Sequence, residues 1–251
     1  MQMAATVKKQ NVTGAQNSIE MLAETGHKIV IAIDGPAGAG KGTLATRLAK
    51  ELNLAFLDTG ALYRVVAMLM IDSNGNPDRA EDVAFCLKAA LKYITPELLS
   101  RPELRKEDVA AMASKVAAVP EVRAALLEFQ RDFAKNPPEG YNGAILDGRD
   151  IGTVVCPDAD IKLFVTADAE TRARRRTEEV AARNGKADFE AILADMKERD
   201  LRDSTRAVAP TKPAEDAIIV DTSAWGIAET FGNTLKKIRD NMATKSKAKA
   251  A

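Results

Sequence analysis

The strongest constraint on the fold is a glycine-rich loop set between a predicted strand and a predicted helix. The apolar run at residues 29–33 predicts a buried strand, and the pattern at residues 44–52 predicts a helix. The loop between them contains Gly35, Pro36, Ala37, Gly38, Ala39, Gly40, Lys41, Gly42 and Thr43. Glycine adopts backbone angles closed to other residues, so such a loop can turn several N–H groups toward an anion. The N-terminus of the helix adds a positive end, and the sequence therefore predicts a phosphate-binding loop.

Two side chains of this loop extend the prediction. Lys41 supplies a mobile positive charge for the outer phosphates of a bound nucleotide. Gly42 follows the lysine, so the hydroxyl that commonly binds magnesium is displaced by one position, to Thr43. We therefore expect Thr43 to contact phosphate rather than to bind a metal ion directly. A plain glycine turn is the alternative, but the spacing, the lysine and the flanking segments favour the phosphate site.

The composition argues against several classes of partner. Basic and acidic residues number 36 each, which argues against duplex DNA or an anionic membrane as a bulk electrostatic partner. Cys86 and Cys156 lack metal-ligand spacing, as expected of reduced thiols in a cytosolic protein. The only histidine, His27, precedes the first strand, so histidine-based catalysis is not expected. No apolar run reaches membrane length and no secretory signal is evident, so we expect a cytoplasmic protein. We also expect a monomer.

Short apolar segments alternate with helical patterns along most of the chain. Strands are expected at residues 29–33, 55–57, 144–146, 161–165 and 217–220, and helices at residues 44–52, 61–71, 170–183, 189–202 and 227–240. This alternation predicts an α/β core, residues 28–71 and 141–241, whose parallel sheet is covered on both faces. Residues 72–140 carry helical patterns at 80–93 and 106–133, which predicts an inserted subdomain. Residues 1–27 and 242–251 are expected to be tails, the second basic and solvated.

Two arginines follow predicted strands at the edge where the glycine loop lies. Arg64 comes shortly after the strand at residues 55–57, and Arg149 comes shortly after the strand at residues 144–146. Ligands of parallel α/β sheets bind beyond the carboxyl ends of the strands, so both arginines should share that edge with the loop. Surface turns with ion-paired arginines would give the same pattern, but the combination with the loop favours a shared anion site.

Two further charged clusters each have two interpretations. If helical, Arg199, Asp203 and Arg206 fall at positions i, i+4 and i+7 on one face. They form either part of a site or a set of helix ion pairs, each contributing roughly a few tenths of a kcal/mol. The arginines of a second run form either a solvated face or a mobile cover over ATP phosphates. That run comprises Arg172, Arg174, Arg175 and Arg176.

Four segments, in this order along the chain, resemble the bacterial cytidylate kinase family. They read DGPAGAGKGT at residues 34–43, DTGALYR at residues 58–64, DGRDIGTVV at residues 147–155, and ERD at residues 198–200 with RAVAP at residues 206–210. The phosphate loop alone is shared by many NTPases, whereas the other three segments together point to this family. The resemblance covers about residues 28–240 and is weaker in the middle.

The resemblance implies the P-loop nucleoside monophosphate kinase fold. It comprises a five-stranded parallel sheet flanked by helices, a nucleoside-monophosphate-binding subdomain and an ATP lid at about residues 168–185. The implied reaction transfers the γ-phosphoryl group of ATP to CMP or dCMP and gives ADP and CDP or dCDP. Mg²⁺ is expected to be held mainly through ATP and water, with Thr43 as the one candidate protein ligand. ATP would be bound by the glycine loop, with Arg172 and Arg175 from the lid.

The resemblance also implies which residues bind the base and the sugar of the acceptor. The family positions that hold cytosine correspond to Ser114 and Arg123 in this chain. Asp150 is implied to lie near the base. Arg199 and Asp203 are implied to lie near the sugar.

The phosphate of the acceptor is implied to have its own set of residues. Arg64, Arg149 and Arg206 would grip the CMP phosphate. Tyr63 would line the acceptor pocket, and Thr59 keeps a hydroxyl where many relatives carry serine. The residues implied to act in the transfer itself are Lys41, Arg149, Asp150 and Arg206.

One segment departs from better-known members of this family. Residues 91–109 are too short for the strand hairpins of many relatives, which bears on the architecture of the base pocket.

Two other functions stay open on the residues alone. A P-loop kinase for another small acceptor, such as another nucleotide or shikimate, is one alternative. An ATP-binding regulatory or nucleic-acid-binding module is the other, and a 4% aromatic content argues against base stacking by such a module.

Overall fold

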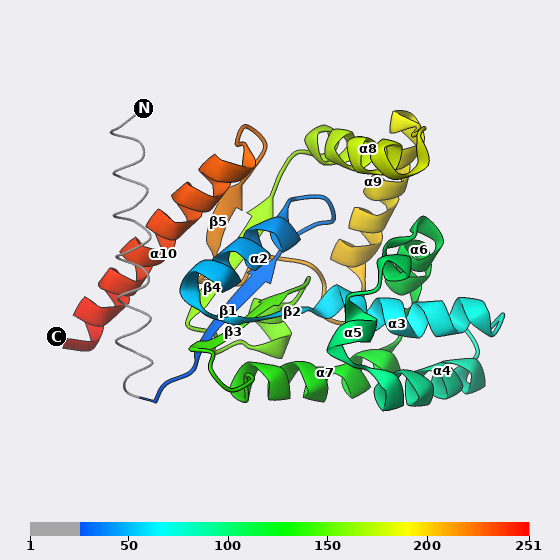
Figure 1. Cartoon of the computed structure of the whole chain (residues 1–251), viewed down its shortest axis with the longest axis horizontal. Helices are drawn as coiled ribbons and strands as arrows, with labels where there is room; N and C mark the ends of the chain where they lie inside the picture. Colours follow the sequence, from blue (N-terminus) through cyan, green and yellow to red (C-terminus); the bar gives the residue numbers. More distant parts are fainter. Residues whose placement is uncertain (1–25, 251) are drawn as a thin grey trace.

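A parallel β-sheet forms the centre of the molecule (Figure 1). The structure is a computed structural model and describes residues 26–250, so most of the expected N-terminal tail and residue 251 lie outside the described residues. Within residues 26–250 the sheet has five strands in the order β2-β3-β1-β4-β5, and each neighbouring pair is parallel. The strands are β1 (Ile29–Asp34), β2 (Ala55–Asp58), β3 (Gly143–Asp147), β4 (Ile161–Thr166) and β5 (Ile218–Asp221). The predicted fold class is confirmed.

Helices cover both faces of this sheet, as the continuous apolar strands require. One face packs on α2 (Lys41–Leu52) and α10 (Ile227–Ala250) through a core that includes Ile31, Leu48 and Leu235. The other face packs on α3 (Thr59–Asp72) and α7 (Pro120–Lys135) through a core that includes Leu146 and Val66. The two cores fix the strands, and so they fix the loops at the strand ends.

The inserted segment is helical, but it differs from the prediction in one place. It contains α4 (Ala80–Tyr93), α5 (Pro96–Leu99), the 3₁₀ turn η1 (Pro102–Arg105), α6 (Glu107–Val116) and α7. The single helix expected at residues 106–133 is therefore wrong: α6 ends at Val116 and α7 begins at Pro120. Val119 has extended backbone angles (φ −77°, ψ 119°), because the residue before a proline is disfavoured in the helical conformation. Residues 91–109, all described, contain no strand.

Two helices follow β4 and lie beside the glycine loop (Figure 1). The first, α8 (Ala169–Asn184), begins where the Asp168 carboxylate accepts a hydrogen bond from the N–H of Thr171, and it ends at Gly185 (φ 76°). The second, α9 (Phe189–Thr205), begins at Asp188 and packs against α8. The range expected for a lid, about residues 168–185, thus coincides with one helix and its two capping residues.

The C-terminal helix is longer than the sequence predicted. A solvated tail was expected from residue 242, but α10 runs through Ala250. Met242 is buried with Leu235 and Ile238 in the core under α10, so the helix keeps its apolar face past residue 241. No helix within residues 26–250 combines the length and the apolar character that crossing a membrane requires.

Candidate functional site

A cleft of about 1330 Å³ opens at the carboxyl ends of the strands. Its walls come from the glycine loop, the N-terminal end of α3, helices α6 to α9 and the turn after β3. The predicted site residues that line it are Ala37, Gly38, Ala39, Gly40, Lys41, Gly42, Thr43, Thr59, Tyr63, Arg64, Ser114, Arg123, Arg149, Asp150, Arg175, Arg199, Asp203 and Arg206. Gly35, Pro36 and Arg172 are not part of this lining. The structure therefore brings most of the predicted residues together from segments far apart in the sequence.

The glycine loop leads directly from β1 into α2. Gly35 (φ 141°) and Gly40 (φ 87°) have backbone angles that favour glycine, and Gly40 is the residue before the first turn of α2. Lys41 begins this helix, and its Nζ donates a 2.8 Å hydrogen bond to the carbonyl oxygen of Pro36. The lysine is thus folded back over its own loop, at the positive end of a helix that faces the cleft.

Lys41 lies in an environment that opposes its charge. Burial lowers its pKa to about 7, and Arg149 and Arg199 contribute in the same direction. Asp147 lies at the end of β3, and burial raises the pKa of this carboxyl to about 6 although Lys41 favours its ionised form. A bound polyphosphate would add its negative charge to that of Asp147 and Asp34, which already favour the charged form of the lysine.

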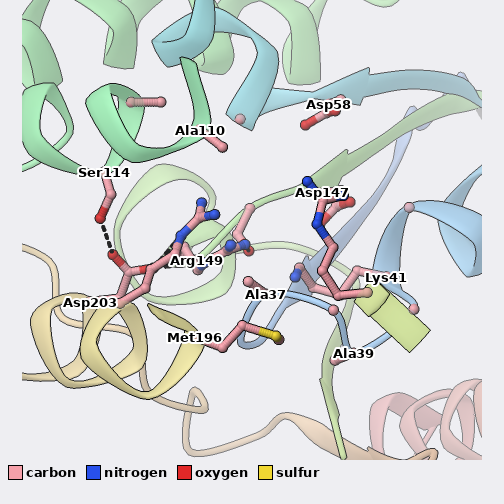
Figure 2. Close-up of a pocket in the computed structure, with 18 of the residues that line it drawn as sticks. Ala37, Ala39, Lys41, Asp58, Ala110, Ser114, Asp147, Arg149, Met196 and Asp203 are labelled. Carbon is pink, nitrogen blue, oxygen red and sulfur yellow. Dashed lines mark hydrogen bonds and ion pairs between the residues drawn. The ribbon is translucent and has the colours of Figure 1, made fainter. Parts of the chain in front are cut away.

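Asp203 of α9 contacts side chains from α6 and from the turn after β3, as Figure 2 shows for Ser114 and Arg149. Its carboxylate accepts a 3.2 Å hydrogen bond from Nε of Arg149 and a 3.4 Å hydrogen bond from the hydroxyl of Ser114 on α6. Nε of Arg199 lies 3.9 Å from the same carboxylate. Burial alone would raise the pKa of Asp203, but Arg149 and Arg199 outweigh it and hold the pKa below its usual value. Asp203 therefore stays ionised and orients two arginines beside the glycine loop.

A second carboxylate, that of Asp150, lies close to two arginines of the cleft. It forms a buried ion pair with Arg123 of α7, and Nη2 of Arg206 lies 3.7 Å from its other oxygen. The guanidinium of Arg123 stacks over the Tyr63 ring at 5.8 Å, and Nε of Arg206 donates to the carbonyl of Ala209. The structure thus places these predicted acceptor-side residues in contact with one another.

Some arginine donors in the cleft have no hydrogen-bond partner. Among the residues that the structure describes, buried Nε of Arg199 and buried Nη2 of Arg206 are without one. Burial lowers the pKa of both arginines, that of Arg199 to about 10. Arginines of this kind suit a phosphate group, because each can donate two hydrogen bonds to it.

Arg172 and Arg175, the two arginines expected in a lid, make different contacts. Arg172 is buried behind the glycine loop, where it donates to the carbonyls of Ala167 and Ala37 and pairs with Asp200 at 2.7 Å. The structure therefore shows Arg172 holding the loop from behind rather than reaching into the cleft. Arg175 does line the cleft, and its guanidinium donates to the hydroxyl and the carbonyl of Thr222.

Two predicted residues on α3 are engaged with the protein backbone. The Thr59 hydroxyl donates a 2.8 Å hydrogen bond to the carbonyl of Asp147, so it ties α3 to the end of β3. Nη1 of Arg64 donates to the carbonyl of Leu104 in η1. Both side chains still line the cleft.

The sequence reasoning gave no role to several residues of the site. Asp34, Asp58 and Asp147 are the last residues of β1, β2 and β3. The sequence signal that could have identified them is an aspartate at the end of each strand, at the edge of the sheet that carries the glycine loop. Arg202 lines the cleft, and its Nη1 donates a 2.9 Å hydrogen bond to the Ser114 hydroxyl. Met196 of α9 lies over the loop, and only the tertiary packing shows this (Figure 2).

Comparisons with known proteins point to one family. The family model described as cytidylate kinase matches residues 31–240. A protein named cytidylate kinase from Paramagnetospirillum magneticum is 53% identical over 82% of this chain and 95% of its own length. Proteins of the same name from Rhodospirillum rubrum and Granulibacter bethesdensis are 52% and 50% identical, over 78% and 84% of this chain and 90% and 97% of their own lengths. The chain belongs to the cytidylate kinase family.

Proposed function

We propose that this protein is a cytidylate kinase that transfers the γ-phosphoryl group of ATP to CMP or dCMP. The observation that carries the proposal is a single cleft in which a phosphate-binding loop faces a cluster of arginines. Phosphoryl transfer joins two polyanions in line, so a protein contributes mainly positioning and charge stabilisation. A cleft with a lysine on one side and arginines on the other supplies both.

The donor side of the cleft is the glycine loop with α2. Backbone N–H groups of the loop and the N-terminus of α2 would hold the phosphates of ATP. Lys41 would leave the Pro36 carbonyl and bind the outer phosphates, where its charge is useful as negative charge shifts during transfer. Arg172 would act indirectly, since it fixes the loop through the Ala37 carbonyl. Arg175 would contribute from the lid.

The acceptor side would bind the phosphate and the base of CMP separately. Arg64, Arg149 and Arg206 are the proposed ligands of the phosphate, with Arg199 and Asp203 beside the sugar. Ser114, Arg123 and Asp150 are the proposed ligands of cytosine. Arg123 and Asp150 pair with each other, and the Ser114 hydroxyl donates to Asp203. Tyr63 would line this pocket through the ring that stacks on Arg123. The phosphate of CMP is itself the nucleophile, so the step needs no strong base.

Kinases of this family generally need a divalent metal, and the residues present fit Mg²⁺. Mg²⁺ prefers oxygen ligands and keeps several waters, so few protein ligands suffice. The carboxyls of Asp58 and Asp147 end paired neighbouring strands, and the Thr43 hydroxyl lines the same cleft. These oxygens would hold the ion directly or through water, and when bound it would neutralise charge on the phosphates of ATP.

Product analysis tests this function. Purified protein with ATP, Mg²⁺ and CMP should yield ADP and CDP in equal amounts, separated by ion-exchange chromatography. Lys41→Ala should nearly abolish CDP formation while the midpoint of thermal unfolding stays close to that of the wild type. ADP without CDP from the wild type, or near-normal CDP formation by the folded variant, would contradict the assignment.

A further inference from the structure

The carboxylate of Asp34 holds the backbone of the segment that carries Arg149 and Asp150. Asp34 is the last residue of β1, directly before the glycine loop, and is 4% exposed. Its Oδ1 accepts a 2.7 Å hydrogen bond from the N–H of Ile151, and its Oδ2 accepts a 2.7 Å hydrogen bond from the N–H of Gly152. Both carboxylate oxygens are thus used on consecutive backbone donors across 117 and 118 positions of sequence.

These two donors begin a single π-helical turn, η2 (Ile151–Val155), that follows Asp150 directly. The other end of the turn is also held. Arg131 of α7 donates from Nε to the carbonyl of Val155 at 3.1 Å and from Nη2 to the carbonyl of Val154 at 3.0 Å. The turn is therefore fixed at its start by the end of β1 and at its finish by a helix of the inserted segment.

What the turn positions is the acceptor side of the cleft. Asp150 is the residue immediately before the turn, and its carboxylate pairs with Arg123 and lies near Arg206. A shift of the turn would move the Asp150 backbone and turn its carboxylate away from these arginines. Arg149, one residue earlier, would move with it and would lose its alignment with Asp203.

We propose that Asp34 is a positioning residue for the acceptor site and that Arg131 supports it from the other end of η2. The proposal rests on the proposed function, because its readout is the use of CMP. Asp34 adjoins the glycine loop, so an effect on ATP binding is the alternative to be separated. A purely structural role for Asp34 would change stability without changing the choice of acceptor base.

Asp34→Asn is the sharpest substitution, because it keeps the shape of the side chain. One oxygen can still accept, but the amide group sets a donor against the second backbone N–H. We expect KM for CMP to rise about tenfold or more, which corresponds to about 1.4 kcal/mol. We also expect the ratio of kcat/KM for CMP over UMP to fall by about fivefold or more. The Kd of a non-hydrolysable ATP analogue should stay within about twofold of the wild-type value.

Asp160→Asn is the matched control. Like Asp34, Asp160 accepts a hydrogen bond from a backbone N–H. Its donor is Val30, near the start of β1 and at the opposite end of the strand from Asp34. This variant should keep the wild-type KM for CMP and the wild-type ratio of CMP to UMP use. Thermal unfolding of each variant shows how much stability the substitution removes.

Arg131→Ala tests the same proposal without altering the surroundings of the loop. It should raise KM for CMP and lower the CMP-to-UMP ratio, and Arg131→Lys should restore part of both. If Asp34→Asn does not fold, the Arg131 pair decides the proposal alone. An unchanged ratio with an unchanged KM for CMP in the folded variants would overturn it, as would an equal loss of ATP-analogue and CMP affinity. CMP turnover by the wild type tests the proposed function independently.

Discussion

Individual residues of the cleft carry charge under conditions that oppose it. Lys41, Arg64, Arg199 and Arg206 all have pKa values lowered by burial, and neighbouring arginines add to the effect. Burying several cations together is unfavourable unless anions compensate them. The stored repulsion is relieved when phosphate groups enter, so the same residues favour binding of a polyanion.

Because the pKa of Lys41 is low, binding of a polyanion should be accompanied by proton uptake, which can be measured. With a pKa of about 7, Lys41 is mostly neutral at pH 8, whereas a bound polyphosphate stabilises the ammonium form and raises the pKa. We expect binding of a non-hydrolysable ATP analogue with Mg²⁺ at pH 8 to take up a substantial fraction of one proton. Calorimetry in buffers of different ionisation enthalpy measures this uptake.

Lys41→Arg is the control for that experiment, since arginine stays protonated throughout. Any uptake through Asp34 or Asp147, whose pKa values burial raises to about 7 and about 6, would remain in this variant. The difference between the two proteins therefore belongs to Lys41. Equal proton uptake by both proteins would show that Lys41 is already charged before binding.

Arg149→Ala and Arg206→Ala should each weaken acceptor use far more than ATP binding. Both are proposed to bind the CMP phosphate, and loss of a buried charged donor plausibly costs about 2–4 kcal/mol of transition-state stabilisation. Titration with CMP and with an ATP analogue separates the two sides of the cleft. Arg79→Ala, which removes an exposed arginine paired with Glu81, should leave both affinities unchanged. Loss of ATP-analogue affinity alone would assign these arginines to the donor side.

At the scale of elements, the connection from β1 to α2 depends on how closely it approaches β4. A Cβ atom on Gly35 would lie 1.9 Å from the carbonyl oxygen of Val165, whereas one on Gly40 would meet nothing within 4 Å. Both glycines have positive φ, so alanine at either position is strained. Only at Gly35 does the added methyl group also displace a backbone of the sheet.

The two glycines therefore form a matched pair of substitutions. Gly40→Ala should lower the free energy of unfolding by about 1 kcal/mol, the cost of the backbone angle alone. Gly35→Ala should lower it by more than about 3 kcal/mol, because a buried backbone clash has to be relieved by moving β4 or the loop. Urea unfolding of both variants measures the difference. Similar losses in the two proteins would show that the loop moves away from β4 easily.

Most elements could be predicted from the sequence, because each short apolar run is followed by a helical pattern. The break between α6 and α7 was missed because the apolar residues Ala117 to Val119 continue the helical pattern up to Pro120. The extension of α10 past residue 241 was missed because the basic composition hides the buried Met242. In both cases tertiary packing or a local backbone restriction outweighed the pattern.

The site was predictable where a short motif carries the chemistry. The glycine loop and the arginines after the strands were found in this way, and the structure places most of them around one cleft. Asp34 and Arg131 were not assigned, because their partners are backbone atoms of a distant turn. Arg172 was expected at the phosphates, but its contacts with Ala37 and Asp200 arise only from the packing of α8 and α9 against the loop.

At the scale of the whole molecule, the two sides of the cleft pack on two different hydrophobic cores. The core under α2 and α10 holds the glycine loop, and the core under α3, α6 and α7 holds the proposed acceptor residues. Helix α8 reaches the inserted segment through an ion pair between Arg176 and Glu107. Closure of such parts around two substrates would exclude water, which limits hydrolysis of ATP.

The central claim is that this cleft selects a cytosine nucleotide as the acceptor. The most direct test measures kcat/KM with ATP for CMP, dCMP, UMP, AMP and shikimate, in the wild type and in Arg123→Ala, by coupled ADP release. In the proposed site, cytosine would present acceptors to Arg123 and a donor to Asp150, whereas uracil would oppose both and leave buried groups unpaired. We expect CMP or dCMP to exceed UMP by orders of magnitude in the wild type, and this ratio to shrink in Arg123→Ala. Equal use of CMP and UMP by the wild type, or a preference for AMP or shikimate, would contradict the claim.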